Sequence, residues 1–371
     1  MNYTQFLALL LCCFIFSCDL IDEVDDIDES ADNESTLYFP PTDSDIWETI
    51  DPVSLGWNVD QQDELYDFLS DNGTRAFIVL KDGKIVMEEY WGQAILGNAS
   101  FDANSQWYWA SAGKTITSLL IGRAQQDGFL DIEDKSSDYL GAGWTNMPKA
   151  QEDQIKVHHQ LSMSTGINHR DVVFNCVEKT CLDYNVDPGE QWFYHNATYL
   201  LLKNVITAAT GVDYKNYTDQ ILSPIGLNGQ WRGAEDISKV YYSTGREMAR
   251  FGLLILNEGI WDSTPILDDA DYFKAMTTSS QDLNLSYGYL WWLNGESSLM
   301  MPQSEMVFNQ SLAPDAPSDL IAGMGKNGQY VDVVPSKNIV VVRMGQAPGD
   351  DFVPTVFHNE MWSYLSAVIG E

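Results

Sequence analysis

The feature that most constrains this chain is a serine followed three residues later by a lysine, at the start of an apolar run. The residues after Lys114 are apolar at helical spacing, which predicts a buried helix that begins near Ser111. Side chains three positions apart lie on one face of a helix, so we expect the Lys114 amine beside the Ser111 hydroxyl. Burial there would lower the lysine pKa from about 10.4 toward neutrality. The pattern predicts a serine nucleophile with a lysine as its base.

Two alternative interpretations apply to this stretch. Ser111 could be an ordinary N-cap, with Lys114 a solvated residue of the first turn. However, Ser-x-x-Lys occurs nowhere else in the chain, and here it leads into an apolar run. Gly113 also supplies half of a Gly-x-Ser-x-Gly elbow, but Trp109 stands where the first glycine belongs, and no strand is expected before it. An α/β-hydrolase is therefore disfavoured.

The charge of the chain restricts its partners. Its 371 residues, 44% of them hydrophobic, can bury a large core, while 54 Asp and Glu against 20 Lys and Arg give a net charge of −34. Such a surface repels nucleic acid and anionic membrane surfaces, and it disfavours acidic substrates. We therefore expect no nucleic-acid partner and attribute the surface carboxylates to solubility.

No motif in the sequence predicts a cofactor or a metal. The histidines do not form a helical i, i+4 pair with a carboxylate, so a zinc centre is not supported. The glycine-rich segment 323–328 precedes a strand and does not open a helix, which argues against dinucleotide binding. An acidic cluster at 22–26 lacks the glycine and the spaced ligands of a calcium loop. The histidines in question are His158, His159, His169 and His195.

The first residues of the chain predict export. Residues 6–16 form an apolar run too short to span a bilayer comfortably, and Ile15-Phe16-Ser17-Cys18 resembles the lipobox of bacterial lipoprotein signal peptides. This resemblance implies a signal peptide over 1–17 and a lipidated Cys18 that anchors the protein to a membrane of the bacterial cell envelope, at its periplasmic or surface face. An ordinary cleaved signal peptide is the alternative, since the segment before the apolar run lacks Lys and Arg. Residues 18–45 are expected to form an acidic tether.

The order of the expected elements predicts a mixed α+β fold. An Asp82-Gly83 turn between two apolar runs predicts a β-hairpin. A largely helical region follows from about 136 to 282, and strands return late in the chain. One domain over 46–371 is therefore expected, with a single sheet built from both chain ends and a helical subdomain inserted between them. The expected helices are 61–69, 111–126, 154–163, 197–209, 213–222, 245–257 and 355–369, and the expected strands are 76–80, 85–91, 290–293, 330–334 and 339–344.

A second motif lies in the middle region, where Tyr194-His195-Asn196 directly precedes an expected helix. Side chains in such a loop can project into a cleft. Together with Ser111 and Lys114, this Tyr-x-Asn resembles the serine β-lactamase-like superfamily of penicillin-binding proteins, for which Ser-x-x-Lys is a signature. The chain looks like the branch that contains class C β-lactamases, D-alanyl-D-alanine carboxypeptidases, related esterases and nylon-oligomer hydrolases. The resemblance implies a central antiparallel sheet of the β-lactamase/transpeptidase type.

Three further segments extend the resemblance over about residues 50–368. Residues 157–167 look like the family's HLLTHTSGL segment, and residues 243–252 are similar to its TARDMARFG helix. Residues 287–292, with the sequence Tyr-Gly-Tyr-Leu-Trp-Trp, also match. Each segment is weak alone, but their order and spacing argue against a chance match.

The resemblance implies a role for each motif residue. Ser111 would be the acylated nucleophile, Lys114 its proton acceptor, and Tyr194 a second acid/base group hydrogen-bonded to both. Asn196 would hold Lys114 and the substrate amide, and the Ser111 backbone N–H would supply half of the oxyanion hole. A phenol beside an ammonium group can lose its proton below its usual pKa of about 10, which agrees with the role of Tyr194. The substrate would be a small ester, amide or peptide.

The chain holds a competing motif, Tyr214-Lys215-Asn216. Asp213 can cap a helix, so Tyr214 is expected in a first helical turn with its ring in the core. Tyr194 instead follows a Pro-Gly pair and precedes a helix, and it can point from a loop end toward Ser111. We therefore expect Tyr194 to be the catalytic tyrosine.

The third motif departs from the family. The Lys-Thr-Gly that usually lines the cleft occurs nowhere in the chain, and the corresponding residues, expected to bind substrate, are Gly325, Lys326, Asn327 and Gly328. This strand edge normally binds the carboxylate of a penicillin, so antibiotic hydrolysis is disfavoured. The glycine-rich form is closer to the esterases and nylon-oligomer hydrolases, which favours an esterase or amidase. The alternatives are a D,D-peptidase and a lipoprotein that binds penicillin or cell-wall peptides without turnover.

The positions of the five cysteines are consistent with export. Three lie within the first 18 residues, and Cys176 and Cys181 lie in the interior of the chain. An exported protein leaves two nearby interior cysteines oxidised, so a disulfide between Cys176 and Cys181 is predicted. Its loop lies between the Ser-x-x-Lys and Tyr-x-Asn motifs, where it would shape the cleft entrance.

Overall fold

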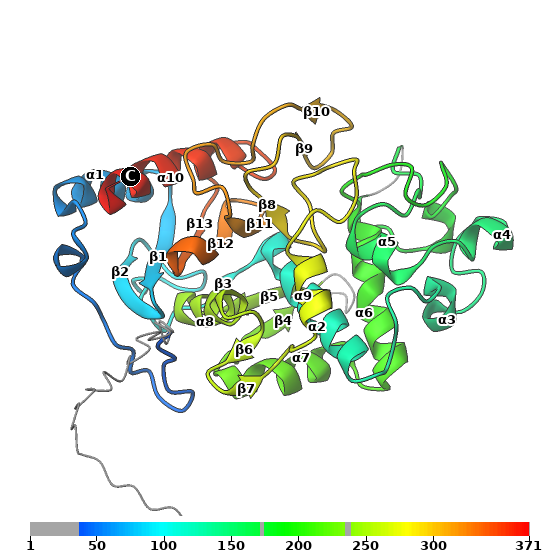
Figure 1. Cartoon of the computed structure of the whole chain (residues 1–371), viewed down its shortest axis with the longest axis horizontal. Coiled ribbons are helices and arrows are strands. Elements are labelled where there is room, and N and C mark those ends of the chain that lie inside the picture. The colour runs from blue at the N-terminus through cyan, green and yellow to red at the C-terminus, as the bar shows by residue number, and fades with distance from the viewer. Residues whose placement is uncertain (1–36, 171–173, 234–238, 371) are drawn as a thin grey trace, which may run out of the picture. The chain divides into compact units, whose positions relative to one another are not determined.

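A six-stranded antiparallel sheet forms the centre of the part of the chain that the computed structural model describes, residues 37–170, 174–233 and 239–370. Its strand order is β2-β1-β13-β12-β11-β8, so early and late strands are neighbours (Figure 1). This order confirms the mixed α+β fold with a sheet built from both chain ends. The expected signal peptide, Cys18 and most of the tether lie outside the described residues. The strands are β1 (Thr74–Lys81), β2 (Lys84–Tyr90), β8 (Trp292–Leu293), β11 (Ile321–Gly325), β12 (Gln329–Val334) and β13 (Ile339–Gly345).

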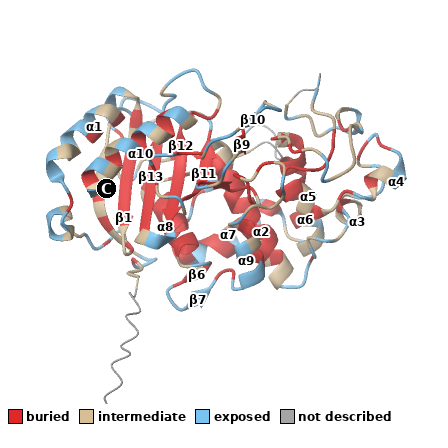
Figure 2. Ribbon diagram, turned by 45° about the horizontal axis from the view of Figure 1, so that its top comes forward, coloured by how far each residue is buried: buried red, intermediate tan, exposed pale blue. Residues whose placement is uncertain are grey.

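The middle of this sheet is the apolar core. β1 and β13 pair antiparallel with Val79 opposite Val341, and every residue of β12 and β13 is buried (Figure 2). Asp82 and Gly83 in the β1–β2 turn have φ of 50° and 81°, as a tight hairpin requires. Strands that are apolar on both faces need a covering layer on each face.

Helices supply both layers. α1 (Gln62–Asp71) and α10 (Thr355–Ile369) pack together on one face, where His358 of α10 lies 2.7 Å from the Asp332 carboxylate of β12 (Figure 1). α8 (Gly245–Leu256) packs on the other face against β1, β12 and β13. Gly252 permits this close approach, because a Cβ there would lie 2.4 Å from Val340.

The helical region lies between β2 and β8 in the chain. Its central element is α2 (Lys114–Gln126), which buries ten of its 13 residues against neighbours that include α6, α7 and α9. A small sheet in the order β3-β5-β4 lies beside the turn that opens α2. The other helices here are α3 (Ser136–Leu140), α4 (Lys149–Glu152), α5 (Val157–Leu161), α6 (Asn196–Thr210), α7 (Tyr214–Leu222) and α9 (Ala270–Met276), and the small strands are β3 (Trp107–Tyr108), β4 (Gln230–Arg232), β5 (Val240–Ser243), β6 (Ile260–Trp261), β7 (Thr264–Pro265), β9 (Leu299–Met300) and β10 (Val307–Phe308).

Most expected elements are confirmed, and two are shorter than expected. The helix expected over 154–163 is only α5, and the strand expected over 290–293 is only β8, because Leu290 has φ of 63° and turns the chain. The glycine-rich β11 was not expected as a strand. Within the described residues, no helix is long and apolar enough to cross a membrane.

Candidate active site

Ser111 lies in a short 3-10 helix, Ala110–Gly113, that runs directly into α2. It is therefore not the cap of α2, as the alternative interpretation would require. Ala110 has φ of 48°, a left-handed conformation that costs an alanine about 1 kcal/mol or more. The preceding Trp109 is fixed by two 2.8 Å hydrogen bonds, from its backbone N–H to Tyr241 O and from Nε1 to Ser243 Oγ. The strained turn is thus held rigidly, and it presents Ser111.

Lys114 stands beside this serine. Its Nζ lies 2.9 Å from Ser111 Oγ, and its side chain is almost fully buried. Nζ also lies 4.9 Å from the ring centre of Tyr194 and 4.5 Å from that of Tyr199. Burial, and after it the positive charge of Lys203, lowers the pKa of Lys114 well below its usual value. This lowered pKa favours the neutral amine, which is the form that can accept the serine proton.

Tyr194 comes from the loop just before α6, and its hydroxyl interacts with Ser111. Burial raises the pKa of Tyr194 well above its usual value, and the interaction with Ser111 offsets this only in part. The expectation that this phenol readily loses its proton beside an ammonium group is therefore wrong, because burial disfavours both the phenolate and the ammonium. Tyr194 is placed here as a protonated donor.

A second buried lysine, which sequence analysis missed, lies behind Lys114. Lys203 of α6 donates a 3.0 Å hydrogen bond to Lys239 O, and its Nζ lies 4.3 Å from the ring centre of Trp231. Burial and the Lys239 charge lower the pKa of Lys203 to about 7. Tyr199 separates the two lysines, because Lys203 Nζ is 5.4 Å from the ring that Lys114 also faces. The available signal was a lysine within the apolar run of an expected helix.

Asn196, the other member of the Tyr-x-Asn motif, is the first residue of α6 and lies close to Ser111 and Lys114 in one pocket. Its Nδ2 donates a 2.8 Å hydrogen bond to Asn175 Oδ1. Its Oδ1 is buried and, among the described residues, has no hydrogen-bond partner. The structure thus shows no bond from Asn196 to Lys114 but leaves a buried amide oxygen facing the pocket.

The glycine-rich segment after β11 divides into two parts. Gly325 packs against the nucleophile turn, because a Cβ on it would lie 3.1 Å from Ser111 N, and Lys326 lines the Ser111 pocket. Asn327 donates to Tyr108 Oη at 2.8 Å and is directed away from that pocket. Gly328, with φ of 74°, forms the turn to β12 and also does not line the pocket.

The pocket above Ser111 has a volume of about 270 Å³. Among the described residues that line it, three are lysines and none is Asp or Glu, in contrast to the net charge of −34 for the whole chain. The lining residues are Ala110, Ser111, Lys114, Phe174, Asn175, Asn196, Tyr199, Leu200, Lys239, Val240, Lys326 and Phe352.

The remaining expected residues are placed as follows. Cys176 and Cys181 form a disulfide with their Cα atoms 6.0 Å apart, directly after Asn175 of the pocket. Tyr214 is buried in α7, where its Oη lies 2.6 Å from Thr117 Oγ1. Over the described ranges, no group of three His, Cys, Asp or Glu side chains could hold a metal ion.

The fold and this serine–lysine pair are those of a serine hydrolase-like protein, and comparison with known proteins identifies its family. Residues 73–356 match the family model described as Beta-lactamase, and the chain therefore belongs to the beta-lactamase family. It is a serine hydrolase-like member, similar to proteins of the penicillin-binding type.

Three relatives illustrate the similarity. An uncharacterised protein of Alkalihalophilus pseudofirmus is 25% identical over 322 residues, which cover 78% of this chain and 88% of the relative. A "Putative D-alanyl-D-alanine carboxypeptidase" of Salmonella heidelberg is 21% identical over 376 residues, with 79% of this chain and 82% of that protein covered. A solved structure named "Putative 6-aminohexanoate-dimer hydrolase", from Bacillus anthracis, has a TM-score of 0.60 and 19% identity with 81% of each chain covered, and it shares the fold.

Proposed function

We propose that this protein is a serine hydrolase that forms an acyl-enzyme on Ser111 and acts on small esters or amides. The observation that supports this most is the buried Lys114 amine 2.9 Å from Ser111 Oγ. In the part of the chain that the structure describes, Lys114 takes part in no ion pair. A buried amine without a carboxylate partner favours its neutral form, which is the form a general base needs.

The proposed acylation step uses three side chains. Ser111 Oγ attacks the substrate carbonyl carbon while its proton passes to Lys114 Nζ, and a tetrahedral oxyanion forms. The Ser111 backbone N–H and a backbone N–H at the end of β11 near Gly325 stabilise this oxyanion. When the bond to the leaving group breaks, that group takes a proton from the Tyr194 phenol, which regains one from the Lys114 ammonium.

Deacylation repeats these transfers with water. A water molecule attacks the acyl carbon and gives a proton to Lys114, and the second oxyanion collapses. Ser111 Oγ leaves and takes back a proton from Tyr194 and Lys114, so the free acid is released and the enzyme is restored. Each proton removed is returned, and the step needs no further reactant.

The substrate class is proposed from the pocket and from one missing motif. The volume of about 270 Å³ suits a small acyl group, and the chain has no Lys-Thr-Gly for the carboxylate of a penicillin. The test is a panel of short-chain p-nitrophenyl esters, a chromogenic cephalosporin and D-alanyl-D-alanine peptides, with Ser111→Ala as control. We expect ester turnover that the variant lacks. Binding of the peptides without turnover of any compound would instead support a non-hydrolytic binding protein.

We also propose that a lipid on Cys18 anchors the protein to a membrane of the cell envelope, as the lipobox-like segment before it suggests. Metabolic labelling with palmitate in a bacterial host tests this. We expect label in the native chain and in a Cys13→Ser control, but not in Cys18→Ser. Label that persists in Cys18→Ser would contradict the anchor.

A further inference from the structure

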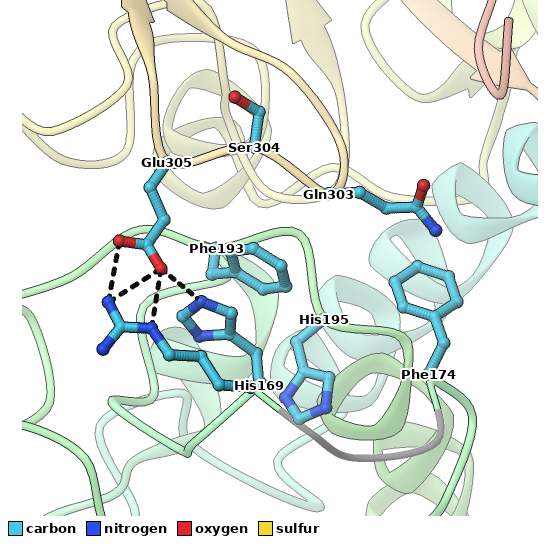
Figure 3. Close-up of a pocket in the computed structure, with 8 residues that line it drawn as sticks. His169, Phe174, Phe193, His195, Gln303, Ser304 and Glu305 are labelled. Carbon is cyan, nitrogen blue, oxygen red and sulfur yellow. Dashed lines mark hydrogen bonds and ion pairs between the residues drawn. The ribbon is translucent and has the colours of Figure 1, made fainter.

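A second cavity of about 560 Å³ adjoins the Ser111 pocket. Phe174 lines both, so they share a wall. The second cavity lies between the loop that carries Phe193 and His195 and a distant segment that carries Gln303 and Glu305 (Figure 3). The proposed hydrolytic mechanism does not use this space.

The Tyr-x-Asn motif connects the two cavities. Tyr194 interacts with Ser111, Asn196 lines the Ser111 pocket, and His195 between them lines the second cavity. Three consecutive residues thus serve the nucleophile and both spaces. Phe174 and the Tyr-x-Asn motif therefore place the second cavity next to the Ser111 pocket.

Half of the described residues that line the second cavity have aromatic rings. The His169 ring stacks on Phe193 with ring centres 3.5 Å apart and an interplanar angle of 17°. His195 meets Phe193 edge to face at 6.5 Å, and Phe174 lies across the opening from Gln303 (Figure 3). Rings in these orientations favour a further ring by stacking or edge contact.

The two described charges at the rim, Arg170 and Glu305, are paired with each other. Glu305 accepts hydrogen bonds from His169 Nε2 at 2.7 Å and from Arg170 Nη2 at 2.9 Å. His195 is different, because its side chain is about 96% buried yet no hydrogen bond to its ring nitrogens is found in the described ranges. Burial, and then His169, lowers the pKa of His195 to about 4, so it is a neutral imidazole with one donor and one acceptor unused.

We propose that this cavity is a substrate subsite that binds an uncharged aromatic ring. The ring belongs to the part of the substrate that extends beyond the bond cleaved at Ser111. The Phe174, Phe193 and His195 rings that line the cavity supply aromatic contacts, and the His195 nitrogens bond a polar group beside the ring. A charged substituent is disfavoured, since Arg170 and Glu305 neutralise each other. The inference rests on the proposed hydrolase function for turnover, but the cavity itself does not.

The test compares ethyl acetate with ethyl phenylacetate and benzyl acetate, which place the ring on the acyl and the alcohol side respectively. We expect the native protein to cleave at least one aromatic ester with a kcat/KM about tenfold above that of ethyl acetate. Gln303→Trp fills the cavity from a position that does not line the Ser111 pocket. It should abolish the preference, whereas Asn309→Trp, a matched exposed control outside both cavities, should keep it.

Two results would overturn the subsite: no preference for either aromatic ester in the native protein, or a preference that survives in Gln303→Trp. If none of these three esters is cleaved, the cavity is judged by binding alone, and the hydrolase proposal is judged by the panel of p-nitrophenyl esters, cephalosporin and peptides. For this, saturation-transfer NMR follows phenylacetamide on the Ser111→Ala protein. A signal that Gln303→Trp removes supports the subsite, and the absence of any signal, or one that persists, contradicts it.

Discussion

Two buried basic side chains, Lys114 and Arg343, differ in what burial does to them. Arg343 of β13 is fully buried, and its guanidinium donates to four backbone carbonyls and one hydroxyl. Lys114 is nearly as buried, but its Nζ has one hydrogen-bond partner, Ser111 Oγ, and two aromatic rings. The acceptors of Arg343 are Asn72 O, Asn327 O, Gly328 O, Gln346 O and Thr74 Oγ1.

The difference shows how hydrogen bonding decides the charge of a buried base. Burial lowers the pKa of Arg343 to about 10, so it still carries its charge at neutral pH, compensated by carbonyl oxygens. Among the described residues Lys114 lacks such acceptors, and burial lowers its pKa well below the usual value. Arg343 therefore stabilises the fold, including the turn after β11 beside the nucleophile. Lys114 can instead exchange a proton with Ser111.

The largest expected effect is on activity when Lys114 is removed. Lys114→Ala should lower kcat/KM for any ester substrate by about a thousandfold or more, because Ser111 loses its proton acceptor. It should not lower the free energy of unfolding, since a poorly solvated amine is removed. Steady-state kinetics and urea denaturation measure the two quantities. Adding Ser111→Ala to this variant should cost little more, because the two residues act as a unit.

Arg343 should respond in the opposite way. Arg343→Met leaves four buried carbonyls without donors and is expected to lower the free energy of unfolding by about 3 kcal/mol. Urea denaturation measures the loss, and Arg232→Met at an exposed position should change it by less than about 0.5 kcal/mol. A stable Arg343→Met protein would break the comparison, since the carbonyls would then not depend on the guanidinium.

The two tyrosines give the next contrast. Tyr194→Phe removes only a hydroxyl that interacts with Ser111 and should lower kcat by about a hundredfold, the usual scale of a lost acid/base group. Tyr214→Phe removes a hydroxyl bonded to Thr117 and should cost only about 1 kcal/mol of stability. Steady-state kinetics with both variants show which tyrosine is catalytic. If Tyr214→Phe lowers kcat and Tyr194→Phe does not, the active site lies elsewhere in the helical region.

The smallest expected effect is a shift in pH dependence on removal of Lys203. The charge of Lys203 disfavours a second charge on Lys114, so Lys203→Met should raise the Lys114 pKa and move the acid limb of kcat/KM to higher pH, by about one unit or less. The shift should be largest below pH 7, where Lys203 is protonated. Lys203→Arg keeps the charge and is the control. If the acid limb of the kcat/KM profile stays in place or moves to lower pH, Lys203 does not lower the pKa of Lys114.

Local patterns in the sequence were enough to predict much of this architecture. The β1–β2 hairpin, α6, α7, α8 and α10 have strong periodicity or turn signals, and the structure confirms them within a few residues. β11 was not predicted, because Ile-Ala-Gly-Met-Gly has only one β-branched residue and two glycines, which are depleted in strands. Gly325 allows β11 to pack closely against the Ser111 turn, because a Cβ there would lie 3.1 Å from Ser111 N. These two residues are more than 200 positions apart in the sequence.

The candidate site was predicted in part for a similar reason. Spacing alone places Lys114 beside Ser111, since both lie in one helical segment. Lys203 was missed because the sequence does not tell a buried lysine from one that reaches solvent. The second cavity depends on the contact between His169 and Glu305, which are 136 positions apart. Such packing is a property of the folded chain and has no local signature.

The central claim is that a neutral Lys114 activates Ser111, and labelling with a fluorophosphonate tests it most directly. The rate of labelling is measured against pH, and the modified peptide is identified by mass spectrometry. We predict rapid labelling of Ser111 at neutral pH, a rate that falls as Lys114 is protonated at a pH well below 10.4, and slow labelling of Lys114→Ala. Labelling at another residue, no labelling, or a rate that rises only near pH 10 would contradict the account.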